Sequence, residues 1–318
     1  MSIGEALVLD PAKAVDKIVD GLRNAARRFR RRGAVLGLSG GIDSSVTAAL
    51  DVLAFGKERV HGLLMPEADS ADESLELGQL LADHLGIEAE VENITPLLTA
   101  ARCYERRDAA FARAVPGYGP GWKSKIVLPS LLDGDSYRLF SLVAVDPGGK
   151  EHRARLDAND YLEIVAATNF KQRTRKMLEY YHADRLNFLV TGTPNLLEFD
   201  QGFFVKLGDG AADVKPIAHL YKTQVYQLAE HLGLPATISS RPPTTDTYSL
   251  PQTQEEFYFS LPYQGMDVCL YAVNNGIEAA QVASELGLGE EQVQRVLDDI
   301  EAKRRMAAYL HAAPVTFA

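Results

Sequence analysis

The chain has 318 residues, of which 46% are hydrophobic and 24% charged, an ordinary composition for a globular protein. Its formal net charge of −10 argues against a general nucleic-acid-binding protein, and its two cysteines cannot build a disulfide framework. The N-terminus lacks a basic stretch leading into an apolar run, and no run approaches the ~18 uninterrupted apolar residues of a membrane helix. We therefore expect a cytoplasmic protein with no membrane-spanning segment and no nucleic-acid partner.

The first third of the chain alternates between helical and strand-like patterns. Helical periodicity and short apolar runs bounded by turn residues distinguish the two kinds of element. The expected helices are 11–32, 46–50, 72–85 and 96–114, and the expected strands are 34–38, 60–65 and 87–91. This alternation predicts an α/β fold with a doubly wound, mainly parallel sheet, whose ligand site lies at the carboxyl ends of the strands.

The pattern changes after residue 115. Residues 116–121 are rich in glycine and proline, and strand-like runs at 137–145 and 151–156 flank an Asp-Pro-Gly-Gly turn. We interpret 116–158 as an insertion that contains a β-hairpin. The elements expected beyond it are a helix at 159–184, a strand at 187–191, a glycine-rich loop at 202–214, a helix at 222–232 and a helical C-terminal region at 245–318. The whole chain, 1–318, is expected to form a single α/β domain carrying this insertion.

The most informative motif is Ser-Gly-Gly-Ile-Asp-Ser-Ser at residues 39–45, between an expected strand and an expected helix. Such a turn aims backbone N–H groups at an anion, and Gly40 and Gly41 allow a close approach that side chains would block. Asp43 places a carboxylate where a phosphate-bound Mg²⁺ would need one. The turn has no lysine, so it is not the lysine-bearing loop of the common nucleoside triphosphatases. It resembles the pyrophosphate loop of the N-type ATP pyrophosphatases; the alternative is a plain glycine turn.

Further motifs narrow this resemblance to the NAD synthetases. Together with the glycine turn, they run in the family's order over roughly residues 10–245. The motifs are Asn-Phe-Lys-Gln-Arg-Thr-Arg-Lys-Met at 169–177, the segment from Leu186 to Glu198, Gly-Phe-Phe-Val-Lys-Leu-Gly-Asp-Gly-Ala-Ala-Asp at 202–213, and Pro-Ile-Ala-His-Leu-Tyr-Lys-Thr at 216–223. Several motifs in order are far more specific than one.

The resemblance implies three groups of site residues. The implied ATP-binding residues are Gly37, Leu38, Ser39, Gly40, Gly41, Ile42, Asp43, Ser44, Thr193, Lys222 and Thr244. The implied deamido-NAD-binding residues are Arg173, Lys206 and Asp213, and the implied Mg²⁺ ligands are Asp43 and Glu198. Two of these assignments have structural alternatives. Glu198 could serve only as an acid near a helix start, and Arg173 or Arg175 could be an exposed surface charge, because they point to different sides of a helix.

The resemblance also implies a reaction, with ATP as co-substrate and Mg²⁺ as cofactor. ATP adenylates the carboxylate of deamido-NAD, ammonia attacks the adenylate, and AMP and pyrophosphate leave. Such a reaction brings anions together, so cationic groups are needed beside the phosphates. Asp43, Lys206 and Lys222 are the implied catalytic residues. The family also implies a homodimer.

The sequence departs from the family pattern at several places. Val205 stands where the family usually has threonine, the segment after Thr244 differs, and the C-terminal Lys-Arg pair cannot be aligned. Two alternatives to deamido-NAD amidation therefore stay open. One is a related ligase that adenylates and amidates a different carboxylate, and the other is a catalytically silent nucleotide-binding protein.

The nitrogen donor is predicted from the cysteines. A glutaminase needs a nucleophilic cysteine and generally a domain of its own, whereas Cys103 and Cys269 lie in apolar, apparently helical surroundings. We also expect no room for such a domain before the first helix. Free ammonia, or ammonia from a separate glutaminase, is the expected donor.

Overall fold

A four-stranded parallel sheet forms the centre of the computed structural model, which describes residues 2–128, 140–245 and 247–317. The strand order is β3-β2-β1-β7, with β1 spanning Ala34–Gly37, β2 Val60–Leu64, β3 Glu88–Val91 and β7 Leu189–Val190. All three strand pairs are parallel, which confirms the expected doubly wound α/β fold. The strand expected at 187–191 shortens to the two residues of β7.

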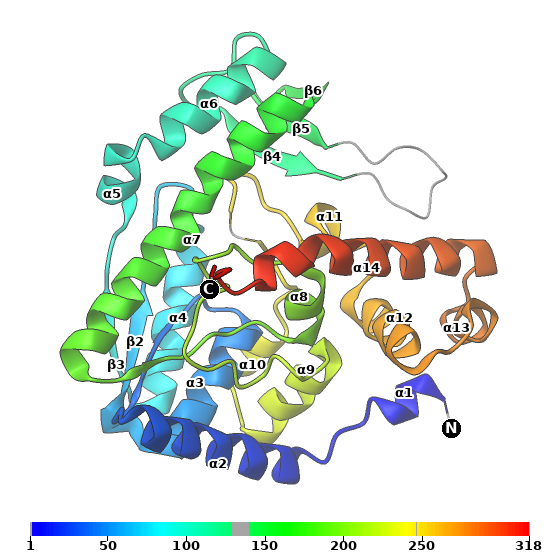
Figure 1. The fold of residues 1–318 in the computed structure, drawn as a ribbon. Coiled ribbons are helices and arrows are strands. Elements are labelled where there is room, and N and C mark those ends of the chain that lie inside the picture. The colour runs from blue at the N-terminus through cyan, green and yellow to red at the C-terminus, as the bar shows by residue number, and fades with distance from the viewer. Residues whose placement is uncertain (1, 129–139, 246, 318) are drawn as a thin grey trace.

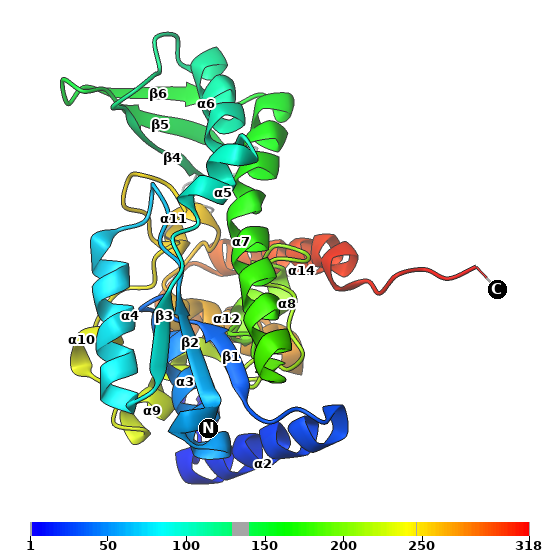
Figure 2. The same cartoon turned by 90° about the vertical axis from the view of Figure 1, so that its left-hand side faces the viewer.

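Different helices cover the two faces of the sheet (Figure 2). Because side chains alternate along a strand, Val35 faces one helical layer and its neighbour Leu36 faces the other. The first layer contains α5 (Thr95–Ala100), α6 (Cys103–Ala114) and α7 (Ala158–Leu186). The second contains α2 (Pro11–Phe29), α3 (Ile42–Phe55), α4 (Asp72–Leu85), α9 (Lys222–His231) and the short α10 (Ala236–Ser239). Burial on both faces explains why β1 and β2 are almost wholly apolar.

Two expected helices end differently in the structure. The helix expected at 11–32 stops at Phe29, because Arg30 adopts the left-handed conformation with φ 55° and caps α2. The helix expected at 96–114 is two helices, separated where Arg102 takes φ 58°. Neither break has the glycine that usually accompanies a left-handed residue, so the sequence contains no local signal for them.

The insertion forms a three-stranded antiparallel sheet of β4 (Lys123–Val127), β5 (Ser141–Val145) and β6 (Glu151–Arg155). The expected hairpin is present as β5 and β6, although residues 137–139 of its expected first strand lie outside the described residues. Strand β4 was not predicted, because Lys-Ser-Lys at its start lacks apolar character. This sheet packs against α6 and α7 through a core that includes Phe111, Ile126, Leu142 and Ile164 (Figure 2).

The C-terminal part of the described chain is helical (Figure 1). It comprises α11 (Gln254–Phe257), α12 (Tyr263–Asn275), α13 (Ala279–Leu286) and α14 (Glu290–His311). Helices α12, α13 and α14 share a hydrophobic core with α1 (Ile3–Ala6) and α8 (Leu196–Gln201), whereas Phe257 of α11 packs against the core of the inserted sheet. Among the residues that the structure describes, no helix is both long and apolar enough to cross a lipid bilayer.

Asp51, in the interior of α3, is fully buried, and burial raises its pKa well above the usual aspartate range. The Thr191 side chain opposes this rise of the Asp51 pKa, but burial outweighs it. The folded protein therefore holds this proton more tightly than the unfolded chain does, so the free energy of unfolding falls as pH rises from about 4 to the folded-state pKa.

We expect Asp51→Asn to remove this contribution, because a neutral amide carries no charge to desolvate. The stability gain of the variant over the parent should be small near pH 4 and grow as pH rises. Urea unfolding of both proteins across that range measures the difference. Asp16→Asn, an exposed change on α2, is the matched control. A difference that is constant with pH would contradict a raised pKa at Asp51.

Candidate active site

The glycine turn joins the end of β1 to the start of α3, which has Gly41 as its N-cap. Gly40 has φ 72°, and a Cβ there would lie 2.9 Å from the Ser74 carbonyl oxygen, so only glycine fits. The Ser44 hydroxyl donates to the Gly41 carbonyl at 3.0 Å, and the Gly41 N–H donates to Ser39 Oγ at 3.3 Å. The free N–H groups at the start of this 14-residue helix therefore lie in a turn held rigid by its own serines.

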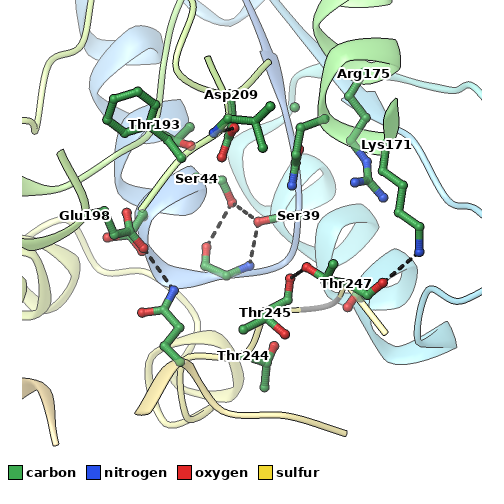
Figure 3. Close-up of a pocket in the computed structure, with 18 of the residues that line it drawn as sticks. Ser39, Ser44, Lys171, Arg175, Thr193, Glu198, Asp209, Thr244, Thr245 and Thr247 are labelled. Carbon is green, nitrogen blue, oxygen red and sulfur yellow. Dashed lines mark hydrogen bonds between the residues drawn. The ribbon is translucent and has the colours of Figure 1, made fainter. Parts of the chain in front are cut away.

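The turn forms one wall of a cavity of about 460 Å³. Figure 3 shows Thr193 and Glu198 on one side of the turn carrying Ser39 and Ser44, and Lys171 on the other. The lining includes every predicted ATP-binding residue except Gly40, namely Gly37, Leu38, Ser39, Gly41, Ile42, Asp43, Ser44, Thr193, Lys222 and Thr244, together with Glu198. Chain segments far apart in sequence thus meet at the carboxyl end of the sheet, as the doubly wound topology requires.

Asp43, Glu198 and Lys222 form a buried charged cluster in this wall. The Lys222 ammonium pairs with Asp43 Oδ2, and Asn195 Nδ2 donates to Asp43 Oδ1 at 3.0 Å. Glu198 accepts at Oε1 from Gln254 Nε2 at 2.9 Å, and it forms a capping box with Asn195 at the start of α8. Lys222 is 1% exposed and Glu198 9% exposed, so both charges are withdrawn from water.

The electrostatics of the cluster favour a further cation. Burial and the nearby Asp43 carboxylate raise the pKa of Glu198 to about 7, against the opposing effect of Lys222. Burial alone would lower the pKa of Lys222, but Asp43 and Glu198 outweigh it and raise that pKa. One lysine therefore faces two carboxylates. Carboxylate oxygens are the protein ligands that Mg²⁺ prefers, so Asp43 and Glu198 have the donor chemistry for this ion.

A second charged network adjoins the cavity where α7 faces the end of β2, and Lys171 is its charged residue in the lining. The Lys171 ammonium is 2.8 Å from Glu67 Oε1, 2.7 Å from Asp69 Oδ2 and 2.7 Å from the Thr247 carbonyl oxygen. Arg107 also pairs with Asp69. The motif comparison did not select these residues, nor Asn195 and Gln254. Among them, only Asn195 could have been found from the sequence. It stands three residues before Glu198, and this spacing predicts a capping box that places the two side chains in contact.

The three predicted deamido-NAD-binding residues lie outside this lining. Arg173 Nε donates to the Lys206 carbonyl oxygen at 3.3 Å. The Lys206 ammonium donates to the Tyr309 carbonyl oxygen at 2.8 Å, outside the cavity lining. Asp213 accepts the Val190 N–H at 2.8 Å. Arg173 and Arg175 do point apart as expected, because Arg175 lines the cavity and Arg173 does not.

Known proteins resemble this chain over nearly its whole length. The family model described as NAD synthase matches residues 14–114 and 143–307. The NH(3)-dependent NAD(+) synthetase of Rhizobium meliloti is 62% identical over 310 residues, covering 98% of this chain and 93% of its own. The enzyme of the same description from Mesorhizobium japonicum is 57% identical, covering 97% of each chain.

Solved structures resemble the fold at lower sequence identity. The NMN synthetase of Francisella tularensis has a TM-score of 0.68 at 23% identity, with 97% of this chain and 99% of that chain covered. An NH3-dependent NAD synthetase from Campylobacter jejuni has a TM-score of 0.64 at 22% identity, covering 98% and 100%. At these identities the likeness concerns the fold alone.

Proposed function

Because the chain belongs to the NAD synthase family, we propose that it is an ammonia-dependent NAD synthetase, a ligase that forms a carbon–nitrogen bond. ATP, deamido-NAD and ammonia react through an adenylated carboxylate to give NAD, AMP and pyrophosphate. The observation that carries this proposal is 62% identity over 98% of the chain to a curated enzyme of that activity. The glycine turn and the Asp43–Glu198–Lys222 cluster in one cavity support it.

In this proposal the glycine turn binds the phosphates of ATP. The backbone N–H groups at the start of α3 face the cavity, and Thr193 and Thr244 line it close by. The helix dipole favours a negative group at that position. Lys222 adds a positive charge next to Asp43, where charge develops on the departing pyrophosphate.

We further propose that Asp43 and Glu198 would hold Mg²⁺ in the loaded enzyme. When bound, the ion would neutralise phosphate charge and orient the leaving group. Asn195 and Gln254 each donate one hydrogen bond to these carboxylates, which orients the remaining lone pairs. Lys222 and the ion would both interact with the Asp43 carboxylate. When the ion binds Asp43, the Lys222 ammonium would turn from Asp43 toward the phosphates.

The deamido-NAD site and the homodimer are proposed together. Arg173 and the main chain of Lys206 are in contact beside an exposed apolar face of α7, where Met177 and Tyr181 follow Arg173 at helical spacing. Met177 is 55% exposed and Tyr181 60% exposed, so both leave apolar surface that a partner can cover. A second copy covering this face would enclose Arg173, Lys206 and Asp213.

Free ammonia, supplied directly or by a separate glutaminase, is the proposed nitrogen donor, and a reducing cytoplasm is the proposed compartment. Both cysteines are buried and unpaired. Burial raises the pKa of Cys269 to about 12 and also raises that of Cys103, so neither thiol forms the thiolate that a glutaminase nucleophile needs.

We expect glutamine not to replace ammonium in the purified chain, because neither buried thiol can attack an amide. NAD formation with each donor, measured by product mass, checks this. The Cys103→Ser and Cys269→Ser variants should retain ammonium-dependent turnover per folded molecule. Glutamine-dependent turnover that matches the ammonium rate and is lost in one serine variant would contradict it.

An acceptor screen tests the proposed function. Purified protein is given ATP, ammonium and Mg²⁺ with deamido-NAD, nicotinate mononucleotide or unrelated carboxylates, and AMP and amide products are measured. AMP and NAD formed in equal amounts with deamido-NAD alone support the proposal. Preference for another carboxylate would indicate a related ligase. ATP binding without AMP formation would indicate a catalytically silent nucleotide-binding protein. Either result overturns the proposal.

A further inference from the structure

Two histidines and a row of glutamates meet where the C-terminal end of α7 lies beside β2 and β3 (Figure 1). His61 is the second residue of β2, and its side chain shares a face with Leu63, which packs in the layer of α7. Glu90 lies on β3, and His182 lies near the end of α7. His61 and His182 are 3% and 1% exposed, so two imidazoles are buried together with their rings stacked. None of these residues lines the cavity.

The acceptor atoms of the three side chains have the spacing of metal ligands. Glu90 Oε2 is 3.4 Å from His61 Nε2 and 3.6 Å from His182 Nδ1. Zinc binds nitrogen and carboxylate oxygen at about 2.0–2.2 Å, which places neighbouring ligands of a tetrahedral ion about 3.3–3.5 Å apart. All three ligand atoms lie within 4.8 Å of one another, so the two imidazoles must draw closer together to reach one ion, while Glu90 is already at ligand spacing from each.

The hydrogen bonds at His182 set its tautomer. His182 Nε2 is 3.1 Å from Glu92 Oε1, and Arg185 Nε donates to His182 Nδ1 at 3.0 Å. The proton therefore lies on Nε2, and the Nδ1 lone pair accepts from Arg185, with Glu90 Oε2 3.6 Å away. A carboxylate behind the distal nitrogen of an imidazole is the arrangement that orients metal-bound histidines. Glu92 occupies that position.

Arg185 places a cationic nitrogen among these acceptors. Its Nη2 is 2.8 Å from His182 Nδ1, 3.0 Å from Glu90 Oε2 and 3.5 Å from His61 Nε2. Three side-chain atoms of the cluster thus surround one nitrogen of the guanidinium. The Arg185 side chain is 39% exposed, so it can turn into solvent without leaving a buried charge behind.

We propose that His61, Glu90 and His182 form a binding site for a first-row divalent transition ion, with Zn²⁺ the best match, and that Arg185 occupies the site until the ion displaces it. Two imidazoles and one carboxylate are a common zinc ligand set that leaves the fourth position to water. The bound ion would tie the end of α7 to the edge strand β3. The site is separate from the ATP cavity and from the Mg²⁺ ligands proposed there.

Cobalt titration of the full-length protein tests this inference, because tetrahedral Co²⁺ absorbs visible light whether or not the enzyme turns over. Excess Mg²⁺ is present to occupy Asp43 and Glu198. We expect one Co²⁺ per chain, displaced by Zn²⁺. Glu90→Gln should weaken binding by at least about tenfold, because even losing a hydrogen-bond partner of a metal ligand typically costs about 10- to 100-fold in affinity. Arg185→Ala should tighten it, because the competing guanidinium is gone. His84→Ala, an exposed change on α4, should have no effect.

The opposite responses of these variants separate a metal site from a purely structural cluster. A Glu90→Gln protein that binds Co²⁺ as tightly as the parent overturns the proposal. So does an Arg185→Ala protein that shows no tetrahedral Co²⁺ spectrum. Glu90 and Arg185 are partly exposed, so neither change requires repacking of the core, and circular dichroism confirms folding. Because no readout depends on NAD formation, failure here leaves the proposed function untouched.

Discussion

Replacing Asp43 or Glu198 by alanine should reduce turnover by about 100- to 1000-fold, the usual effect of removing one group that stabilises charge in a transition state. The two residues come from separate segments and face the same cavity, and a single lysine does not balance their charge. Each variant should also need more Mg²⁺ to reach half of its maximal rate. Steady-state AMP formation at increasing Mg²⁺ measures both effects.

Glu76→Ala, an exposed carboxylate change on α4, is the matched control and should keep the parental rate. Thermal unfolding of each variant distinguishes lost chemistry from lost structure, because Glu198 also caps α8 through Asn195. Near-parental turnover of a folded Asp43 or Glu198 variant at saturating Mg²⁺ would remove that residue from the proposed ion site.

Replacing Lys222 by methionine should affect both stability and turnover. The lysine is fully buried and pairs with Asp43, so its loss leaves Asp43 and Glu198 facing one another without a counter-charge. Breaking a buried pair in this way typically costs about 3–5 kcal/mol of unfolding free energy. Turnover should fall by about 100-fold or more, since a positive charge beside the phosphates is lost.

Mg²⁺ provides a further test of this variant. If the ion binds Asp43 and Glu198, it should raise the unfolding temperature of Lys222→Met more than that of the parent, because Lys222 no longer competes for Asp43. Turnover should stay low at the same Mg²⁺ concentration. Lys13→Met, which removes an exposed lysine, is the control and should change neither quantity. An equal Mg²⁺-dependent shift in parent and Lys222→Met would contradict competition at Asp43.

Features that depend on neighbouring residues were determined by the sequence. The strand, glycine turn and helix around residues 39–45 occupy one short segment, so the conformation at Gly40 and the start of α3 at Gly41 follow from local rules. The same holds for the alternation of strands and helices, which predicts the parallel sheet. The hairpin of β5 and β6 was also recognisable, because its turn lies between the two strands.

Features that depend on long-range contacts were decided only by the tertiary structure. The pairing of Asp43 with Lys222 joins segments 179 residues apart, and that of Lys171 with Glu67 joins segments 104 apart. Arg102 breaks a helix without a glycine signal, and β4 is a strand only because β5 pairs with it. The periodicity of apolar residues predicts which face of a helix or strand is buried, but not which distant side chain contacts that face. Local sequence therefore identifies the family and the conformation of the glycine turn, whereas packing sets which charges are paired and buried.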